Sequence, residues 1–124
     1  MPTGYISRLQ AGTALKVTVY LNEDTGSGHG FLSDDILEFL LDQGIAGATV
    51  IRAHAGFGSH RRLHRSDSGG VGGEHLPVIL FFIDEVAKVR SILPELLTMV
   101  TDGLVEAHPT EVLKDISGLE KVLS

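Results

Sequence analysis

Cysteine is absent from this chain of 124 residues. Its absence excludes disulfide bonds, thiolate nucleophiles and sulfur-rich zinc sites, and it fits a reducing cytoplasm. Long apolar runs are absent as well, because the longest covers only residues 76–83 and a membrane helix needs roughly 20 residues. Residues 1–10 contain no apolar stretch typical of a secretory signal. These absences predict a soluble, cytoplasmic protein.

Positive charge is also scarce. Ten Lys and Arg residues stand against sixteen Asp and Glu residues, which gives a net charge of -6 at pH 7. This balance argues against nucleic acid as a partner, since nucleic-acid binding requires a broad basic face. Hydrophobic residues make up 43% of the chain and charged residues 21%. Such a composition is typical of a globular protein, and the length predicts a single domain over residues 1–124.

Carboxylates are missing from one stretch, between Asp42 and Asp67. Within it lies a Gly-rich turn at residues 55–58, called the glycine turn below. Four of the ten basic residues and three histidines surround this turn, namely Arg52, Arg61, Arg62 and Arg65 with His54, His60 and His64. Because no opposite charge in the stretch neutralises them, the pattern predicts a small anionic ligand.

Strand and helix signals alternate along the chain. Apolar and polar residues alternate over residues 15–21, which predicts a half-buried strand. Helical spacing follows over residues 34–41, with acidic residues in the first turn and Gly44 as the left-handed stop. The β-branched residues 48–53 predict a second strand. Residues 22–30 and 57–75 are predicted to be loops.

The second half of the chain repeats this alternation. Residues 76–83 are apolar at both alternating sets of positions, which predicts a strand that is buried on both faces. Asp84 is predicted to cap a second helix that is kinked or restarted at Pro94. A turn at residues 101–103 leads to a fourth strand over residues 104–113, interrupted at Pro109. Residues 115–124 are predicted to be a C-terminal tail, in which residues 117–124 could instead form a short helix.

This order predicts an α+β, ferredoxin-like βαββαβ fold with a core over about residues 15–113. Its four-stranded antiparallel sheet carries both helices on one face. The other face then exposes one apolar set of the strand at residues 76–83, and an exposed apolar face predicts oligomerisation.

Three segments resemble a bacterial family of uncharacterised PII-like proteins, which is related to the nitrogen-regulatory PII signalling proteins. They are GIAGATVIRAHAGFG at residues 44–58, SHRRLH at residues 59–64 and LPVI at residues 76–79. The resemblance implies a homotrimer with ligand clefts between subunits, an adenine nucleotide as ligand, and a flexible T-loop-like segment at residues 57–75. It also implies a regulatory partner, such as a membrane transporter, a channel or an enzyme.

The resemblance also implies a set of ligand-binding residues. The backbone of residues 56–59 would approach the nucleotide, which glycine permits because it has no side chain. Asp102 and Gly103 match the second ligand loop of PII proteins, but Leu104 replaces its phosphate-binding lysine. This departure counts against triphosphate binding unless an arginine of the loop supplies the cation. The candidate ligand-binding residues are Arg52, Gly56, Phe57, Gly58, Ser59, His60, Arg61, Arg62, His64, Arg65, Asp102 and Gly103.

Two alternatives to nucleotide signalling stay open. His60 and His64 have i, i+4 spacing, so they could bind a metal together with His75 in a trimer resembling the divalent-ion tolerance proteins. The protein could instead be a ligand-free scaffold of a transporter. We expect no enzymatic activity, because G-x-S-x-G, H-E-x-x-H and P-loop motifs are absent from the sequence. Neither Tyr5 nor Tyr20 lies in the loop, so uridylylation is not expected.

Overall fold

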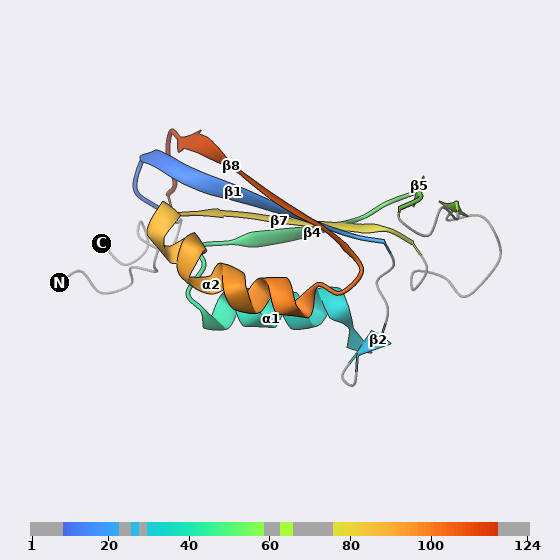
Figure 1. Cartoon of the computed structure of the whole chain (residues 1–124). Helices are drawn as coiled ribbons and strands as arrows, with labels where there is room; N and C mark the ends of the chain where they lie inside the picture. Colours follow the sequence, from blue (N-terminus) through green and yellow to red (C-terminus); the bar gives the residue numbers. More distant parts are fainter. Residues whose placement is uncertain (1–8, 23–25, 28–29, 59–62, 66–75, 117–124) are drawn as a thin grey trace.

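A computed structural model describes residues 9–22, 26–27, 30–58, 63–65 and 76–116. Two helices and four longer strands make up most of it, with four strands of two residues in the connections (Figure 1). In chain order the elements are β1 (Gly12–Leu21), β2 (Gly26–Ser27), β3 (Gly30–Phe31), α1 (Leu32–Asp42), β4 (Ala48–Arg52), β5 (Ala55–Gly56), β6 (His64–Arg65), β7 (Val78–Asp84), α2 (Val86–Met99) and β8 (Gly103–Val112).

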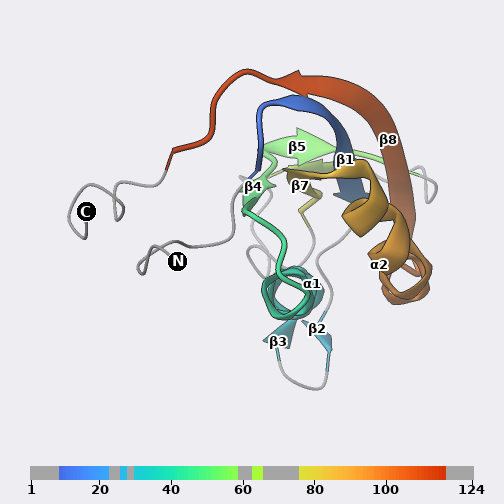
Figure 2. The same ribbon diagram turned by 90° about the vertical axis from the view of Figure 1, so that its left-hand side faces the viewer.

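The four longer strands form one antiparallel sheet in the order β4-β7-β1-β8. At its centre Val17 pairs with Phe82 on β7 and with Ala107 on β8. Both helices pack on the same face of this sheet (Figure 2). The predicted ferredoxin-like arrangement is therefore confirmed. Among the described residues, no helix is long and apolar enough to cross a membrane.

The core lies between the sheet and the helices, and strand alternation directs side chains into it. Successive residues of β7 alternate between buried and half-buried positions, so only one face of this strand is fully buried in the single chain. Its buried set faces the helices. The core cluster consists of Leu15, Val17, Val19, Leu21, Ile36, Leu40, Ile45, Val78, Leu80, Phe82, Val89, Ile92 and Leu96.

Within the described residues, no helix covers the opposite face of the sheet, which is called the open face below (Figure 1). Its apolar side chains include Ile51 on β4, which is 50% exposed, and the half-buried Phe81 on β7. The Lys16 ammonium lies 5.2 Å from the centre of the Phe81 ring. The predicted apolar set of β7 does lie on this face, but Ile79, Phe81 and Ile83 are half-buried rather than exposed in the single chain.

Contrary to prediction, β8 is not interrupted at Pro109 and α2 is not restarted at Pro94, whereas a kink of α2 at Pro94 stays a prediction. β8 continues through Pro109, which pairs with Leu15. Because β8 is an edge strand, it tolerates a residue that lacks a backbone N–H. α2 also continues through Pro94. Proline removes the hydrogen bond to the carbonyl of Arg90, but both residues are exposed, so water can solvate that carbonyl.

The start of α2 corrects the prediction that Asp84 caps this helix. Glu85 is the N-cap residue, and Asp84 precedes it with only 1% exposure. The Asp84 carboxylate accepts hydrogen bonds from the backbone N–H of Glu85 at 2.7 Å and of Ala46 at 2.8 Å. The Lys88 ammonium lies 3.7 Å away. Asp84 therefore ties the α1–β4 connection to the beginning of α2.

Short paired strands occur in or beside the two predicted loops. Residues 22–30 include β2, which pairs with β3, and residues 57–75 include β6, which pairs with β5. Pairs of two residues leave no detectable sequence period, which explains why the pattern did not indicate them.

Candidate functional site

Four chain connections meet at one end of the main sheet. β1 and β4 end there, and β7 and β8 begin there (Figure 1). The backbone N–H of Ala53 donates to the carbonyl of Pro77 at 2.8 Å, which joins the end of β4 to the start of β7. The glycine turn and the Asp102–Gly103 pair, which the sequence places far apart, both lie at this end. We call it the loop end of the sheet.

The glycine turn packs against two neighbouring segments, β6 and Pro77. Ala55 pairs with Arg65 and Gly56 pairs with His64, so the chain folds back on itself as a short two-stranded ribbon. A Cβ atom on Gly56 would lie 3.1 Å from Cγ of Pro77, which is a tight contact. Phe57 follows with 63% exposure. The turn therefore presents an exposed aromatic ring beside closely packed backbone.

Asn22 connects the glycine turn with the Asp102 loop (residues 100–103). Its side-chain amide Nδ2 donates to Oδ1 of Asp102 at 2.6 Å, and its backbone N–H donates to the Asp102 carbonyl at 3.2 Å. A Cβ atom on Gly58 would overlap the Asn22 amide oxygen and would lie 2.5 Å from Cγ of Asn22. Two of the predicted ligand residues, Gly58 and Asp102, therefore contact the same side chain.

Gly103 is restricted by the backbone of β1. A Cβ atom there would overlap the Tyr20 carbonyl oxygen and would lie 3.2 Å from Cα of Leu21. Because backbone atoms of a central strand cannot move aside, only glycine fits at the first position of β8. This close approach fixes where the Asp102 loop leaves the sheet.

Arg52, the last residue of β4, is exposed. Its guanidinium carbon lies 5.2 Å from the centre of the Phe31 ring at the start of α1. This cation–π geometry orients the guanidinium while its charge is retained.

Several candidate residues lie outside the described part of the chain. They are Ser59, His60, Arg61, Arg62 and His75. For His64 and Arg65 only the backbone is described. Their predicted roles toward an anion or a metal are therefore untested. Within the described ranges, no group of three or more His, Cys, Asp or Glu side chains is arranged to hold a metal ion.

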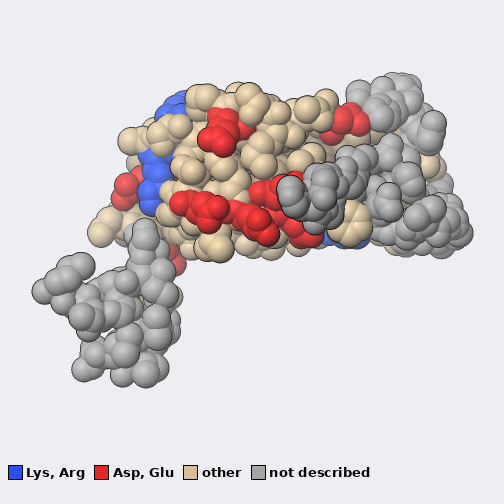
Figure 3. Space-filling view, turned by 90° about the horizontal axis from the view of Figure 1, so that it is seen from below, with Lys and Arg blue, Asp and Glu red and all other residues tan. Residues whose placement is uncertain are grey.

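Acidic side chains gather over the helix layer (Figure 3). The exposed acidic residues of α1 are Asp34, Glu38 and Asp42, and this helix carries no Lys or Arg. Such a surface repels anions. The helix face is therefore unsuited to an anionic ligand.

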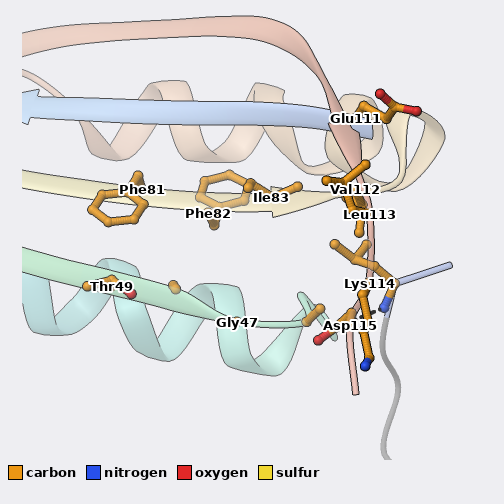
Figure 4. Close-up of a pocket in the computed structure, with 13 residues that line it drawn as sticks. Gly47, Thr49, Phe81, Phe82, Ile83, Glu111, Val112, Leu113, Lys114 and Asp115 are labelled. Carbon is orange, nitrogen blue, oxygen red and sulfur yellow. Dashed lines mark hydrogen bonds between the residues drawn. The ribbon is translucent and has the colours of Figure 1, made fainter. Parts of the chain in front are cut away.

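A separate hollow of about 510 Å³ lies at the other end of β7 (Figure 4). The end of β8 and the following residues 113–115 lie there beside the ends of β7 and β4. The backbone N–H of Leu9 donates to the Asp115 carboxylate at 3.0 Å beside this hollow. Residues 78 and 84 of an extended strand are about 20 Å apart. The hollow is therefore distinct from the loop end, and it contains none of the predicted ligand residues.

Sequence reasoning missed Asn22. The available signal was its position directly after the alternating residues 15–21, where a polar side chain at a strand end can hydrogen-bond neighbouring loops. Nothing in the sequence indicated which loops those would be.

The fold is that of PII-like proteins. A structure of CPII, a nitrogen regulatory PII-like protein from Thiomonas intermedia K12 bound to ADP, AMP and bicarbonate, matches 86% of this chain and 94% of its own chain. The TM-score is 0.63 and the sequence identity 16%. CPII from the same organism bound to ADP, AMP and acetate matches the same shares with a TM-score of 0.56 and 16% identity. At such low sequence identity, these TM-scores establish a shared fold alone.

The chain belongs to the family DUF190, described as "Uncharacterized ACR", whose model matches residues 14–112. A UPF0166 protein from Aquifex aeolicus (strain VF5) is 32% identical over 78 residues, which cover 63% of this chain and 72% of the relative. The resemblance to an uncharacterised PII-like family is therefore confirmed.

Proposed function

We propose that this protein is a PII-like regulator that binds an adenine nucleotide at the loop end of the sheet, in clefts between the subunits of a homotrimer. The observation that carries this proposal is the meeting of Gly58 and Asp102 on one side chain, Asn22. The solved CPII proteins of the same fold, bound to ADP and AMP, support the choice of nucleotide. Ligand binding would change the conformation of residues 57–75 and so alter docking on a partner protein.

The chemistry of the loop end fits such a ligand. The glycine turn allows the backbone to approach a phosphate closely, and Phe57 offers an exposed ring for stacking. Arg52 supplies positive charge at this end, and the arginines of residues 61–65 would add to it. No catalytic step is part of this proposal, because the site is proposed to bind and release its ligand unchanged.

Titration calorimetry with ADP, AMP, ATP and bicarbonate tests the binding site. We expect ADP or AMP to bind, and the affinity to fall as salt rises, because charge attraction at an exposed site is screened. Replacing Arg61, Arg62 and Arg65 together by Ala should weaken binding by about tenfold or more, since one lost charge-assisted hydrogen bond costs about 1.5 kcal/mol. Arg90→Ala, which removes an exposed arginine of α2, is the control and should bind normally. Unchanged affinity in the triple variant would contradict the proposed role of these arginines.

Light scattering on the purified protein tests the trimer. We expect a trimer at micromolar concentration, and we expect Ile51→Glu to dissociate it, because a charge on the open face cannot be buried against another subunit without a partner. Leu41→Glu is a matched control, since Leu41 lies on α1 and is already 75% exposed. A monomeric parent protein would exclude the intersubunit cleft.

A further inference from the structure

Asn22 makes an unusual set of contacts for a residue at a strand end. It follows the last residue of β1 and is only partly buried. Nevertheless, both its backbone and its side chain bond Asp102, which lies eighty positions further along the chain. The same amide group limits how closely Gly58 can approach.

The orientation of the Asn22 amide follows from chemistry. A carboxylate only accepts hydrogen bonds, so the group that faces Asp102 Oδ1 at 2.6 Å has to be the NH₂. The amide oxygen then points toward the backbone of Gly58, where it fills the position that a Cβ atom would take. The amide is thus held by the Asp102 loop on one side and packed against the glycine turn on the other.

We propose that Asn22 is a positioning residue that couples the glycine turn to the Asp102 loop. A displacement of either loop moves the amide, and the amide then displaces the other loop. The regulatory role of this coupling rests on the proposed function: an anion bound at one loop would then change the conformation of both. The coupling itself depends only on the contacts among Asn22, Gly58 and Asp102.

A cycle of variants tests the coupling without any ligand. Gly58→Ala should lower the melting temperature, because its methyl group overlaps the Asn22 amide. Asn22→Gly should also lower it, because the bond to the Asp102 side chain is lost. In the double variant the overlap is absent, so the loss should be clearly smaller than the sum of the two single losses. If the two losses simply add, Gly58 and Asn22 are not coupled and the proposal is wrong.

Asn22→Asp is a second test that keeps the size of the side chain. It places a carboxylate against the Asp102 carboxylate, so like charges should push the two loops apart. We expect faster amide hydrogen exchange at both residues 56–58 and residues 101–103 in this variant. Gln43→Ala, which truncates an exposed amide at the far end of α1, should leave exchange at these residues unchanged. Faster exchange at only one of the two loops would overturn the coupling.

Titration of the parent protein and of Asn22→Ala with ADP tests whether the coupling of the two loops affects the proposed nucleotide site. If the parent protein binds ADP, Asn22→Ala should weaken binding by about tenfold, the cost of losing one hydrogen bond to a charged group. In the parent, ADP should slow exchange at both loops; in the variant, it should slow exchange at one loop at most. Slowing at both loops in Asn22→Ala would overturn the proposal. A parent that binds no ADP would refute the proposed function, while the variant cycle would still decide the coupling.

Discussion

Replacing Asp84 by alanine should lower the free energy of unfolding by about 3 kcal/mol. The side chain is 1% exposed and accepts two backbone hydrogen bonds, from Ala46 and Glu85. An unsatisfied buried N–H costs about 1–3 kcal/mol. The N–H of the half-buried Ala46 should account for about 2 kcal/mol of the lost unfolding free energy. The N–H of the exposed Glu85 should account for less, because water replaces the carboxylate as its acceptor.

The lysine beside Asp84 adds to this loss. The Lys88 ammonium donates to the Gly44 carbonyl at 2.8 Å and lies 3.7 Å from the carboxylate, so it bridges the two sides of the same connection. Without Asp84 the ammonium loses its charge partner but remains partly solvated, since the Lys88 side chain is 30% exposed. Its contribution should therefore stay below about 1 kcal/mol.

Urea unfolding at one fixed protein concentration measures the effect, which should appear as a midpoint lower by about 1.5–2 M. Asp84→Asn keeps one acceptor oxygen and should lose about half as much. Asp42→Ala is the control, because it removes an exposed carboxylate from the C-terminal end of α1, where negative charge opposes the helix dipole. A loss below about 1 kcal/mol for Asp84→Ala would refute this reasoning. Folded Asp84→Ala should bind ADP as the parent does, because Asp84 lies at the end of β7 remote from the loop end.

Two further predictions concern α1 and the open face. Gly44→Ala should cost about 1 kcal/mol in urea unfolding, because Gly44 has φ +77°; Gly47→Ala, with nothing within 4 Å of the added atom, should be nearly neutral. Tyr20 donates a hydrogen bond to the Glu106 carboxylate. This bond, together with the negative charge of the carboxylate, raises the pKa of the Tyr20 phenol above its ordinary value. The stabilisation from this bond is therefore present below about pH 10 and is lost as pH rises through the raised pKa. In a Tyr5→Phe background, Glu106→Gln should lower the pKa seen by ultraviolet titration; an unchanged pKa would contradict this account.

The fold was predictable because its strongest signals are local and periodic. Strand alternation over residues 15–21 identifies the side of β1 that packs on the helices. The acidic first turn of α1 and the positive φ of Gly44 match the predicted start and stop of that helix. Where the prediction was wrong, a tertiary arrangement decided the outcome. Pro109 is tolerated because β8 lies at the edge of the sheet, and edge position cannot be read from the residue itself.

The candidate site was predictable in its parts but not in its assembly. The sequence indicates a glycine turn and an Asp-Gly pair, and the family resemblance names both as ligand loops. Their meeting depends on a polar residue at the end of a third segment, Asn22, whose partners are set by the sheet order. No periodicity or motif encodes such a contact, since it depends on the pairing of β1 with β8.

The glycines show how a functional interpretation changes once packing is known. The sequence attributes Gly56 and Gly58 to close approach of a ligand. In the described part of the chain, positive φ occurs at two glycines, Gly12 and Gly44, so backbone conformation does not require glycine at either position of the turn. Close packing against Pro77 and Asn22 already explains why glycine is needed at positions 56 and 58, without any bound ligand. A bulky side chain at Gly58 therefore displaces Asn22 as well as any ligand. A binding role of Gly58 is separated from a packing role only by comparing the Gly58 variant with the double variant that also carries Asn22→Gly.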